Sequence, residues 1–230
     1  MSEKTILGLN MRYVSNKQTT SLSIFFIILI LTLTIAFSNG SFDFSFLSLL
    51  KGETTSIENT IFFEIRIPRV ILACLVGTSL AISGACLQGL FRNPLADPGL
   101  IGVSAGAALG ASIIIVFGST IFSKFILSTF LLPLAACFGS GVVIFLLFLL
   151  TKGFGYQGIT YMLLVGIAIN AIASVGIGIL TFISTESELR GLTFWTMGSF
   201  GGVTWPLLIP AILIIITSLI FLIPVLRDLD

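Results

Sequence analysis

Histidine is missing from this sequence, and charged residues are few. Only 9% of its 230 residues are Asp, Glu, Lys or Arg, where a soluble domain has about 25%. The lack of histidine excludes histidine-based acid–base catalysis and a histidine-ligated haem. Cys74, Cys86 and Cys137 form no C-x-x-C motif, and the sequence has no GxxxxGK[ST] loop for phosphate. We therefore expect no metal site, no catalytic residue and no cofactor or ATP bound by this chain.

The sequence also lacks an excess of either charge. Lys and Arg number 11 and Asp and Glu number 10, so the net charge is +1 and no basic block is present. This balance excludes nucleic acid as a partner, because phosphates require clustered cations. By contrast, 56% of the residues are hydrophobic. Membrane lipid must therefore surround most of the chain.

Six stretches without charge are long enough to cross a membrane, which takes about 20 residues. In lipid, backbone polar groups are satisfied only within a helix or a closed barrel, and the sequence lacks the alternation typical of barrel strands. We predict an all-α polytopic membrane protein: a leader at 1–20 and a single transmembrane domain at 21–230. The six predicted spans are 21–38, 68–91, 98–118, 125–150, 158–183 and 204–226.

The first hydrophobic segment has two interpretations. Basic residues precede the apolar run 22–37 and small residues follow it, as in a secretory signal peptide. Its polar leader and apolar run are longer than is usual for such a peptide, which favours a retained helix. With the N-terminus on the cytoplasmic side, Lys and Arg number six inside and five outside. This distribution narrowly follows the positive-inside rule and predicts a cytoplasmic leader.

Small residues recur at four-residue spacing in three of the predicted helices. Such stripes let helix backbones approach closely in lipid, so they predict packing surfaces and, for span 68–91, a helix surrounded by others. The first stripe consists of Ala73, Gly77, Ala81, Ala85 and Gly89, and the second of Gly102, Gly106 and Gly110. The third, Gly166, Asn170, Ser174 and Gly178, contains an amide and a hydroxyl, which either bond to a neighbouring helix or face a water-filled cavity.

The sequence Arg66-Ile67-Pro68-Arg69 opens the second span. Proline suits a first helical turn, and arginines three residues apart share a helix face. The two cations have two interpretations. They extend to the membrane interface, or they form a patch that binds carboxylates of a partner.

Two connecting segments carry further signals. Residues 93–99 join the second and third spans, and Asp97 is placed as an N-cap before Pro98, the first helical residue. This predicts a rigid hairpin built on Asn93, Pro94, Asp97, Pro98 and Gly99. In Phe194–Trp205, glycines break the helix and two tryptophans suit a membrane interface, which predicts a short surface helix and a re-entrant turn.

Several of these segments together resemble one known family. The R-x-P-R motif at Arg66, the ISGA…Q sequence at Ile82–Gln88 and the N-P-L-A-D-P-G-L-I-G hairpin at Asn93–Gly102 occur in the order found in permease subunits of ABC importers for iron-siderophores, haem and cobalamin. The segment Phe194–Trp205 is similar to the stretch before the sixth helix of that family. The sequences of these segments are most similar to those of members that import haem, and next to those of members that import ferric siderophores.

The resemblance implies a non-enzymatic transporter subunit of the bacterial cytoplasmic (inner) membrane. Such a permease forms a homodimer, binds two ATP-binding subunits on the cytoplasmic side and receives cargo from an external substrate-binding protein. Arg66 and Arg69 would then face glutamates of the binding protein. The fifth helix would line the translocation pathway, which falls on Gly166, Asn170, Ser174 and Gly178.

The chain departs from the family in its length. Members form a ten-helix permease, whereas this chain ends at Arg227–Asp230, where their ATPase-coupling segment begins. We therefore expect the C-terminal part of the family domain to be missing, which leaves a truncated, non-transporting or accessory membrane subunit as an alternative. An ion-coupled transporter or channel is a further alternative, but it usually needs an ionisable residue within a span, and none is present.

Overall fold

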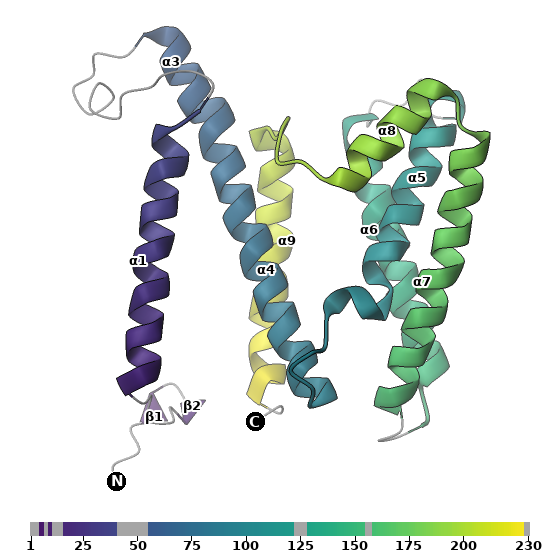
Figure 1. Cartoon of the computed structure of the whole chain (residues 1–230), viewed down its shortest axis with the longest axis horizontal. Helices are drawn as coiled ribbons and strands as arrows, with labels where there is room; N and C mark the ends of the chain where they lie inside the picture. Colours follow the sequence, from purple (N-terminus) through teal and green to yellow (C-terminus); the bar gives the residue numbers. More distant parts are fainter. Residues whose placement is uncertain are drawn as a thin grey trace. The chain divides into compact units, whose positions relative to one another are not determined.

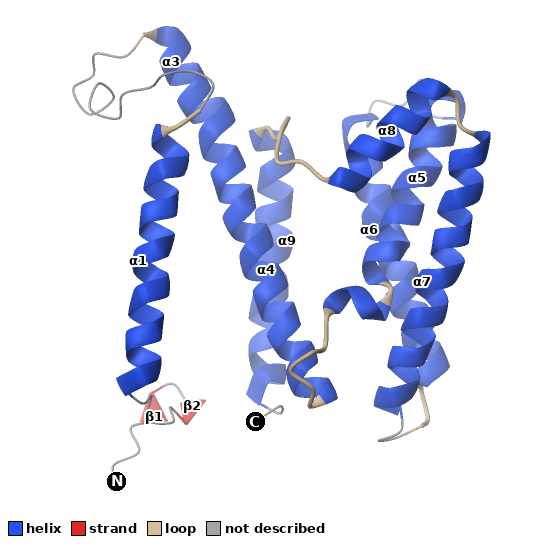
Figure 2. Cartoon of the chain, in the orientation of Figure 1, coloured by secondary structure: helices blue, strands red, loops and turns tan. Residues whose placement is uncertain are grey.

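The computed structural model describes residues 5–6, 9–10, 16–40, 55–121, 128–154 and 158–227. These residues are mainly helical, apart from a short antiparallel pair between β1 (Thr5–Ile6) and β2 (Leu9–Asn10) (Figures 1 and 2). The helices are α1 Asn16–Ser38, α3 Ser56–Thr60, η1 Ile61–Arg66, α4 Ile67–Phe91, η2 Pro98–Ile101, α5 Val103–Ile121, α6 Ser128–Thr151, α7 Gly158–Ile183, α8 Glu186–Met197 and α9 Trp205–Arg227. Most of the predicted leader 1–20, the start of span 125–150 and residues 228–230 lie outside this description.

The prediction of an all-α polytopic membrane protein is confirmed. Within the part of the chain that the structure describes, five helices are long and apolar enough to cross a membrane: Gln18–Ser38, Ser56–Phe91, Phe130–Thr151, Thr160–Ile183 and Trp205–Leu222. The apolar helix Val103–Gly118 is shorter and occupies the place of the third predicted span. The helices are therefore the elements expected, although most of them begin at other residues than predicted, the second and third spans by the widest margins.

The second span begins earlier than its predicted start at 68. Thr55 and Glu58 form a capping box, in which the Thr55 backbone N–H donates to Glu58 Oε2 at 2.6 Å and the Glu58 N–H donates to Thr55 Oγ1 at 3.3 Å. This cap starts the helix at Ser56, and η1 continues it as a π-helix into α4. Glu64 and Arg66 therefore lie within a helix. The capping-box pattern T-x-x-E was present in the sequence. The predicted span began after the charged residues that follow this pattern, and its start was therefore placed too late.

The third predicted span also begins at a different residue. Asp97 caps a helix as predicted, with Oδ1 accepting from the Gly99 N–H at 2.6 Å, but that helix is the 3₁₀ turn η2. Gly102 then adopts a left-handed conformation with φ of 87°, which ends the turn. The α-helix α5 starts only at Val103, because the chain must bend at this glycine.

The described residues form two compact units. The first contains the residues up to Gly77 together with those from Phe200 onward, and the second contains Thr78–Ser199. In the second unit, α5, α6 and α7 lie side by side and α8 lies against α5 (Figure 1). One buried cluster of this unit joins Ile101 to Val143 and Leu147, and another consists of Val116, Leu180 and Leu192.

Glycines hold α5 and α6 close together. A Cβ on Gly106 would lie 2.7 Å from the Gly139 carbonyl oxygen, and a Cβ on Gly139 would overlap the carbonyl of Gly106. Gly110 similarly faces the backbone of Ala135. The predicted packing role of the second small-residue stripe is therefore confirmed. Along α4 the outcome differs, since added Cβ atoms on Gly77 and Gly89 would meet no described atom within 4 Å.

We predict that Gly139→Val destabilises the protein by about 2 kcal/mol or more, because a larger side chain must separate α5 from α6. Gly141→Val is the matched control on the same helix, since a Cβ at Gly141 has no neighbour within 4 Å. Thermal unfolding in detergent measures both variants. Equal losses of stability would contradict the close backbone contact.

Candidate functional site

The first predicted site lies in the first unit, where Arg66 ends the π-helical segment η1. Its side chain is 8% exposed. Nη1 donates to the carbonyl oxygens of Phe37 at 2.8 Å and Ser38 at 3.3 Å. These two residues end α1, where the last carbonyls of a helix have no partner within the helix. Arg66 therefore caps the first long helix.

The contact around this guanidinium is close. A Cβ on Gly40 would lie 2.6 Å from Nη2 and 3.0 Å from Cζ of Arg66. The buried ring of Phe62 lies against Phe37, with 6.0 Å between the ring centroids. Backbone at the end of α1 thus lies close to Arg66, and an aromatic pair joins the same two segments.

The structure places the two arginines of the R-x-P-R motif in different environments. Arg69 is exposed, whereas Arg66 and the intervening Pro68 are buried. A paired cationic patch on one open face, one of the two interpretations of these arginines, is therefore not formed, because the carbonyls at the end of α1 bind Arg66. Binding of a partner's carboxylates to either arginine stays a prediction.

A tryptophan joins the start of α9 to the same π-helical segment. Trp205 Nε1 donates to the carbonyl oxygen of Phe63 at 3.0 Å. Trp205 is the last residue of the segment 194–205, in which α8 ends at Met197 before the glycines, where the sequence predicted a helix break. The Trp205 indole therefore donates a hydrogen bond to the protein backbone. The residues next to Trp205 in the sequence give no sign of this partner.

The second predicted site lies in the second unit, at the hairpin between α4 and η2. Asn93 Oδ1 accepts from the Leu95 N–H at 2.9 Å, and the Ala96 N–H donates to the Asn93 carbonyl at 3.1 Å. Together with the Asp97 cap, these bonds define the hairpin through its own side chains and backbone. Pro94 lies within this turn, and Pro98 is the first residue of η2.

The structure brings this hairpin together with the stripe on α7. Asn170 Nδ2 donates to the carbonyl oxygens of Gly99 at 3.0 Å and Leu100 at 3.4 Å. Gly166 is buried, and a Cβ there would lie 2.6 Å from the Leu100 carbonyl oxygen. We gave two interpretations of the polar groups in this stripe, a hydrogen bond to a neighbouring helix or a water-filled cavity. The Asn170 amide makes the hydrogen bond, and its partner is η2.

The other half of the α7 stripe is uncovered. Ser174 is exposed and donates to the Asn170 carbonyl at 2.8 Å, within its own helix. Gly178 is exposed, and a Cβ there would have no described atom within 4 Å. The stripe thus divides into a packed half at Gly166 and Asn170 and an open half at Ser174 and Gly178.

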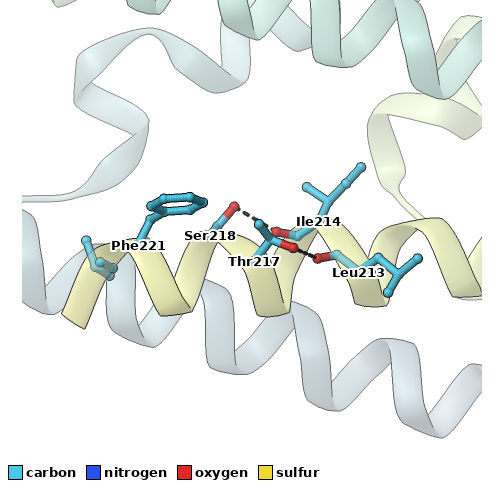
Figure 3. A pocket seen from close by; sticks show the side chains of 6 residues that line it. Leu213, Ile214, Thr217, Ser218 and Phe221 are labelled. Atoms are coloured by element: carbon cyan, nitrogen blue, oxygen red, sulfur yellow. Dashed lines mark hydrogen bonds between the residues drawn. The ribbon is translucent and has the colours of Figure 1, made fainter. Parts of the chain in front are cut away.

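A recess along α9 was not predicted from the sequence (Figure 3). Its volume is about 600 Å³, and it is lined by Leu213, Ile214, Thr217, Ser218, Phe221 and Leu222. The Thr217 hydroxyl donates to the Leu213 carbonyl at 2.6 Å, and the Ser218 hydroxyl donates to the Ile214 carbonyl at 2.8 Å. Both hydroxyls are therefore satisfied within the helix, and the recess is mainly apolar. The Thr-Ser pair in an apolar helix was the available sequence signal.

Comparison with known proteins indicates one family. The profile of the FecCD transport family matches residues 24–230. The chain is 40% identical over 197 residues to the haemin transport system permease protein of Yersinia pestis, a match that covers 85% of this chain and 58% of the relative. It is 37% identical to the molybdate import system permease protein of Haemophilus influenzae, over 66% of this chain and 43% of the relative.

Two further matches agree with this family. The vitamin B12 import system permease protein of Klebsiella pneumoniae is 39% identical over 67% of this chain and 45% of its own length. A solved structure of a metal-chelate type ABC transporter in an inward-facing conformation matches this chain with a TM-score of 0.75 and 28% sequence identity. The match covers 92% of this chain and 63% of the solved chain. The chain thus spans less than two thirds of the relatives it matches.

We predict that Asn170→Leu loosens η2, because the carbonyls of Gly99 and Leu100 lose their amide donor. Amide hydrogen exchange over residues 97–103 should become roughly fivefold faster, since one such bond contributes about 1 kcal/mol. Ser174→Ala is the control, because that hydroxyl bonds only within α7. Unchanged protection in Asn170→Leu would contradict a stabilising bond between α7 and η2.

Proposed function

Because this chain belongs to the FecCD transport family, we propose that it is the membrane-spanning permease of an ABC importer that moves an iron-containing chelate across the bacterial inner membrane. The observation that carries this proposal is the family match over residues 24–230, which includes the R-x-P-R motif, the hairpin and the α7 stripe. The proposed cargo is haem, with ferric siderophores next.

The cargo preference rests on the extent of the sequence similarity. The match to a haemin permease covers 85% of this chain, whereas those to molybdate and vitamin B12 permeases cover 66% and 67%. The identities themselves differ little, at 40%, 37% and 39%. Haem needs no ligand from a permease, because the permease provides a passage while a binding protein holds the iron.

The proposed partners follow from membership of the family. They are two ATP-binding subunits, which we place on the cytoplasmic side with the N-terminus. A second permease copy completes the membrane part, and an external binding protein delivers cargo. The exposed guanidinium of Arg69 suits carboxylates of that protein, since arginine binds them through two parallel hydrogen bonds.

The proposed pathway uses the open half of the α7 stripe. Small and hydroxyl-bearing residues at Ser174 and Gly178 leave space and polarity along a helix that is otherwise apolar. Gly166 and Asn170 support this surface from the packed half. Transport then follows alternating access: ATP binding and hydrolysis on the partners change which conformation of the permease is populated.

The direct test is uptake by proteoliposomes that contain this chain, its ATP-binding subunit and its external binding protein. We expect ATP-dependent uptake of haem in excess over cobalamin and molybdate. Uptake of another cargo alone would overturn the haem assignment. Failure of this chain to associate with any ATP-binding subunit would overturn the permease assignment itself.

A substitution in the open half of the stripe tests the pathway. We predict that Gly178→Trp reduces uptake to background while the ATP-binding subunit still co-purifies, because the indole fits the open space beside α7 but obstructs passage. Ile179→Trp is the control, since this neighbouring side chain is already large and 58% exposed. Full uptake by Gly178→Trp would remove this face of α7 from the pathway.

A further inference from the structure

Pro68 lies inside the long helix that begins at Ser56 and ends at Phe91, and its side chain is fully buried. By its sequence this proline suits a first helical turn, where a missing N–H costs nothing. In the interior of a helix, a proline instead leaves a carbonyl without its donor and commonly kinks the chain. The structure must therefore accommodate Pro68 in another way.

The π-helical segment η1 determines which carbonyl is left open. The Ile67 N–H donates to the carbonyl of Phe62, five residues earlier, and not to that of Phe63. In the same register, an N–H at position 68 would reach the Phe63 carbonyl, but proline has no N–H. The helix Ser56–Phe91 therefore supplies no donor to this carbonyl.

Trp205 supplies the missing donor from a distant part of the chain. Its Nε1 donates to the Phe63 carbonyl at 3.0 Å, across 142 residues of sequence, and both residues belong to the first unit. An indole N–H can only donate, so an open carbonyl is a suitable partner. Because Trp205 is the first residue of α9, this bond joins the start of that helix to the carbonyl that Pro68 leaves open.

We propose that Pro68 and Trp205 act as one pair. The proline, in the π-helical register, opens the Phe63 carbonyl, and Trp205 is the positioning residue that uses this carbonyl to hold the start of α9. Each residue depends on the other, since a backbone N–H at position 68 would occupy the carbonyl. The pair gives the proline of the R-x-P-R motif a role that the proposed function does not explain, and it rests on contacts of the chain alone.

Deuterium exchange of the Trp205 indole proton tests this dependence in the full chain in detergent micelles. The sequence has two tryptophans, so NMR of the labelled indoles shows two N–H signals, and Trp195→Phe assigns them. Pro68→Ala should accelerate exchange of the Trp205 indole about tenfold, because a new backbone N–H takes the Phe63 carbonyl. Pro133→Ala is the matched control, since this proline also lies inside a helix, and it should leave the exchange unchanged. Equal rates in the unaltered chain and in Pro68→Ala would overturn the proposal.

A double-mutant cycle measures whether the two residues act through each other. Its readout is amide exchange of Leu207 and Leu208, whose N–H groups donate to the Thr204 carbonyl at the start of α9. Trp205→Phe should accelerate this exchange about fivefold, as expected for the loss of one hydrogen bond. In a Pro68→Ala chain the same change should accelerate it less than about twofold, because the indole bond is already lost. Equal acceleration in both chains would show that Trp205 acts independently of Pro68 and would overturn the pair.

Two further variants separate the hydrogen bond from the packing of the ring. Replacement of Trp205 by benzothienylalanine keeps the shape of the indole and exchanges only its N–H for sulfur, so it should accelerate exchange at Leu207 and Leu208 as Trp205→Phe does. Trp195→Phe removes an indole that is also half-buried but has no hydrogen bond to the described part of the chain, and it should leave both amides unchanged. Unaltered exchange with benzothienylalanine would overturn the role of Trp205 even if Pro68→Ala failed to fold.

Discussion

The structure depends on one constraint, the need of every polar group to find a partner when lipid surrounds the chain. Within helices, hydroxyls satisfy it by donating to the carbonyl one turn earlier, as Thr32, Ser112 and Thr217 do. Among the described residues, no buried side-chain nitrogen or oxygen lacks a hydrogen bond. Arg66 and Asn170 cannot satisfy their groups locally, and they bond to backbone carbonyls 29 and 71 residues away. These two side chains therefore define how separate elements meet.

The local features of the fold could be predicted from the sequence because their signals are local. The Asp97 cap, the break after Met197 and the packing role of the glycine stripe on α5 all follow from spacing and residue type. The start of the second span was wrong, because charged residues concealed the capping box at Thr55. The start of the third was wrong, because the left-handed Gly102 ends a 3₁₀ turn first. A π-helical segment leaves no recognisable pattern in one sequence.

The partners of the candidate residues could not be predicted, for a different reason. Spacing shows that Asn170 is polar in an apolar helix, but not that Gly99 lies opposite it. Equally, two arginines in one motif look equivalent until α1 supplies carbonyls to only one of them. Long-range contacts depend on how helices pack, and that is decided by many side chains together. The family resemblance, by contrast, rested on several separated motifs and is confirmed.

The two candidate sites have one feature in common. At each of them a single side chain binds backbone carbonyls of another element, and exposed residues lie beside that contact. Arg66 holds the end of α1 next to the exposed Arg69, and Asn170 holds η2 next to the open half of the α7 stripe.

The central claim is that this chain works as the permease of an ABC importer. Native mass spectrometry of the complex purified in detergent tests it most directly. The account predicts a particle with two copies of this chain and two ATP-binding subunits, and a chain that carries no ATP-binding subunit would contradict it.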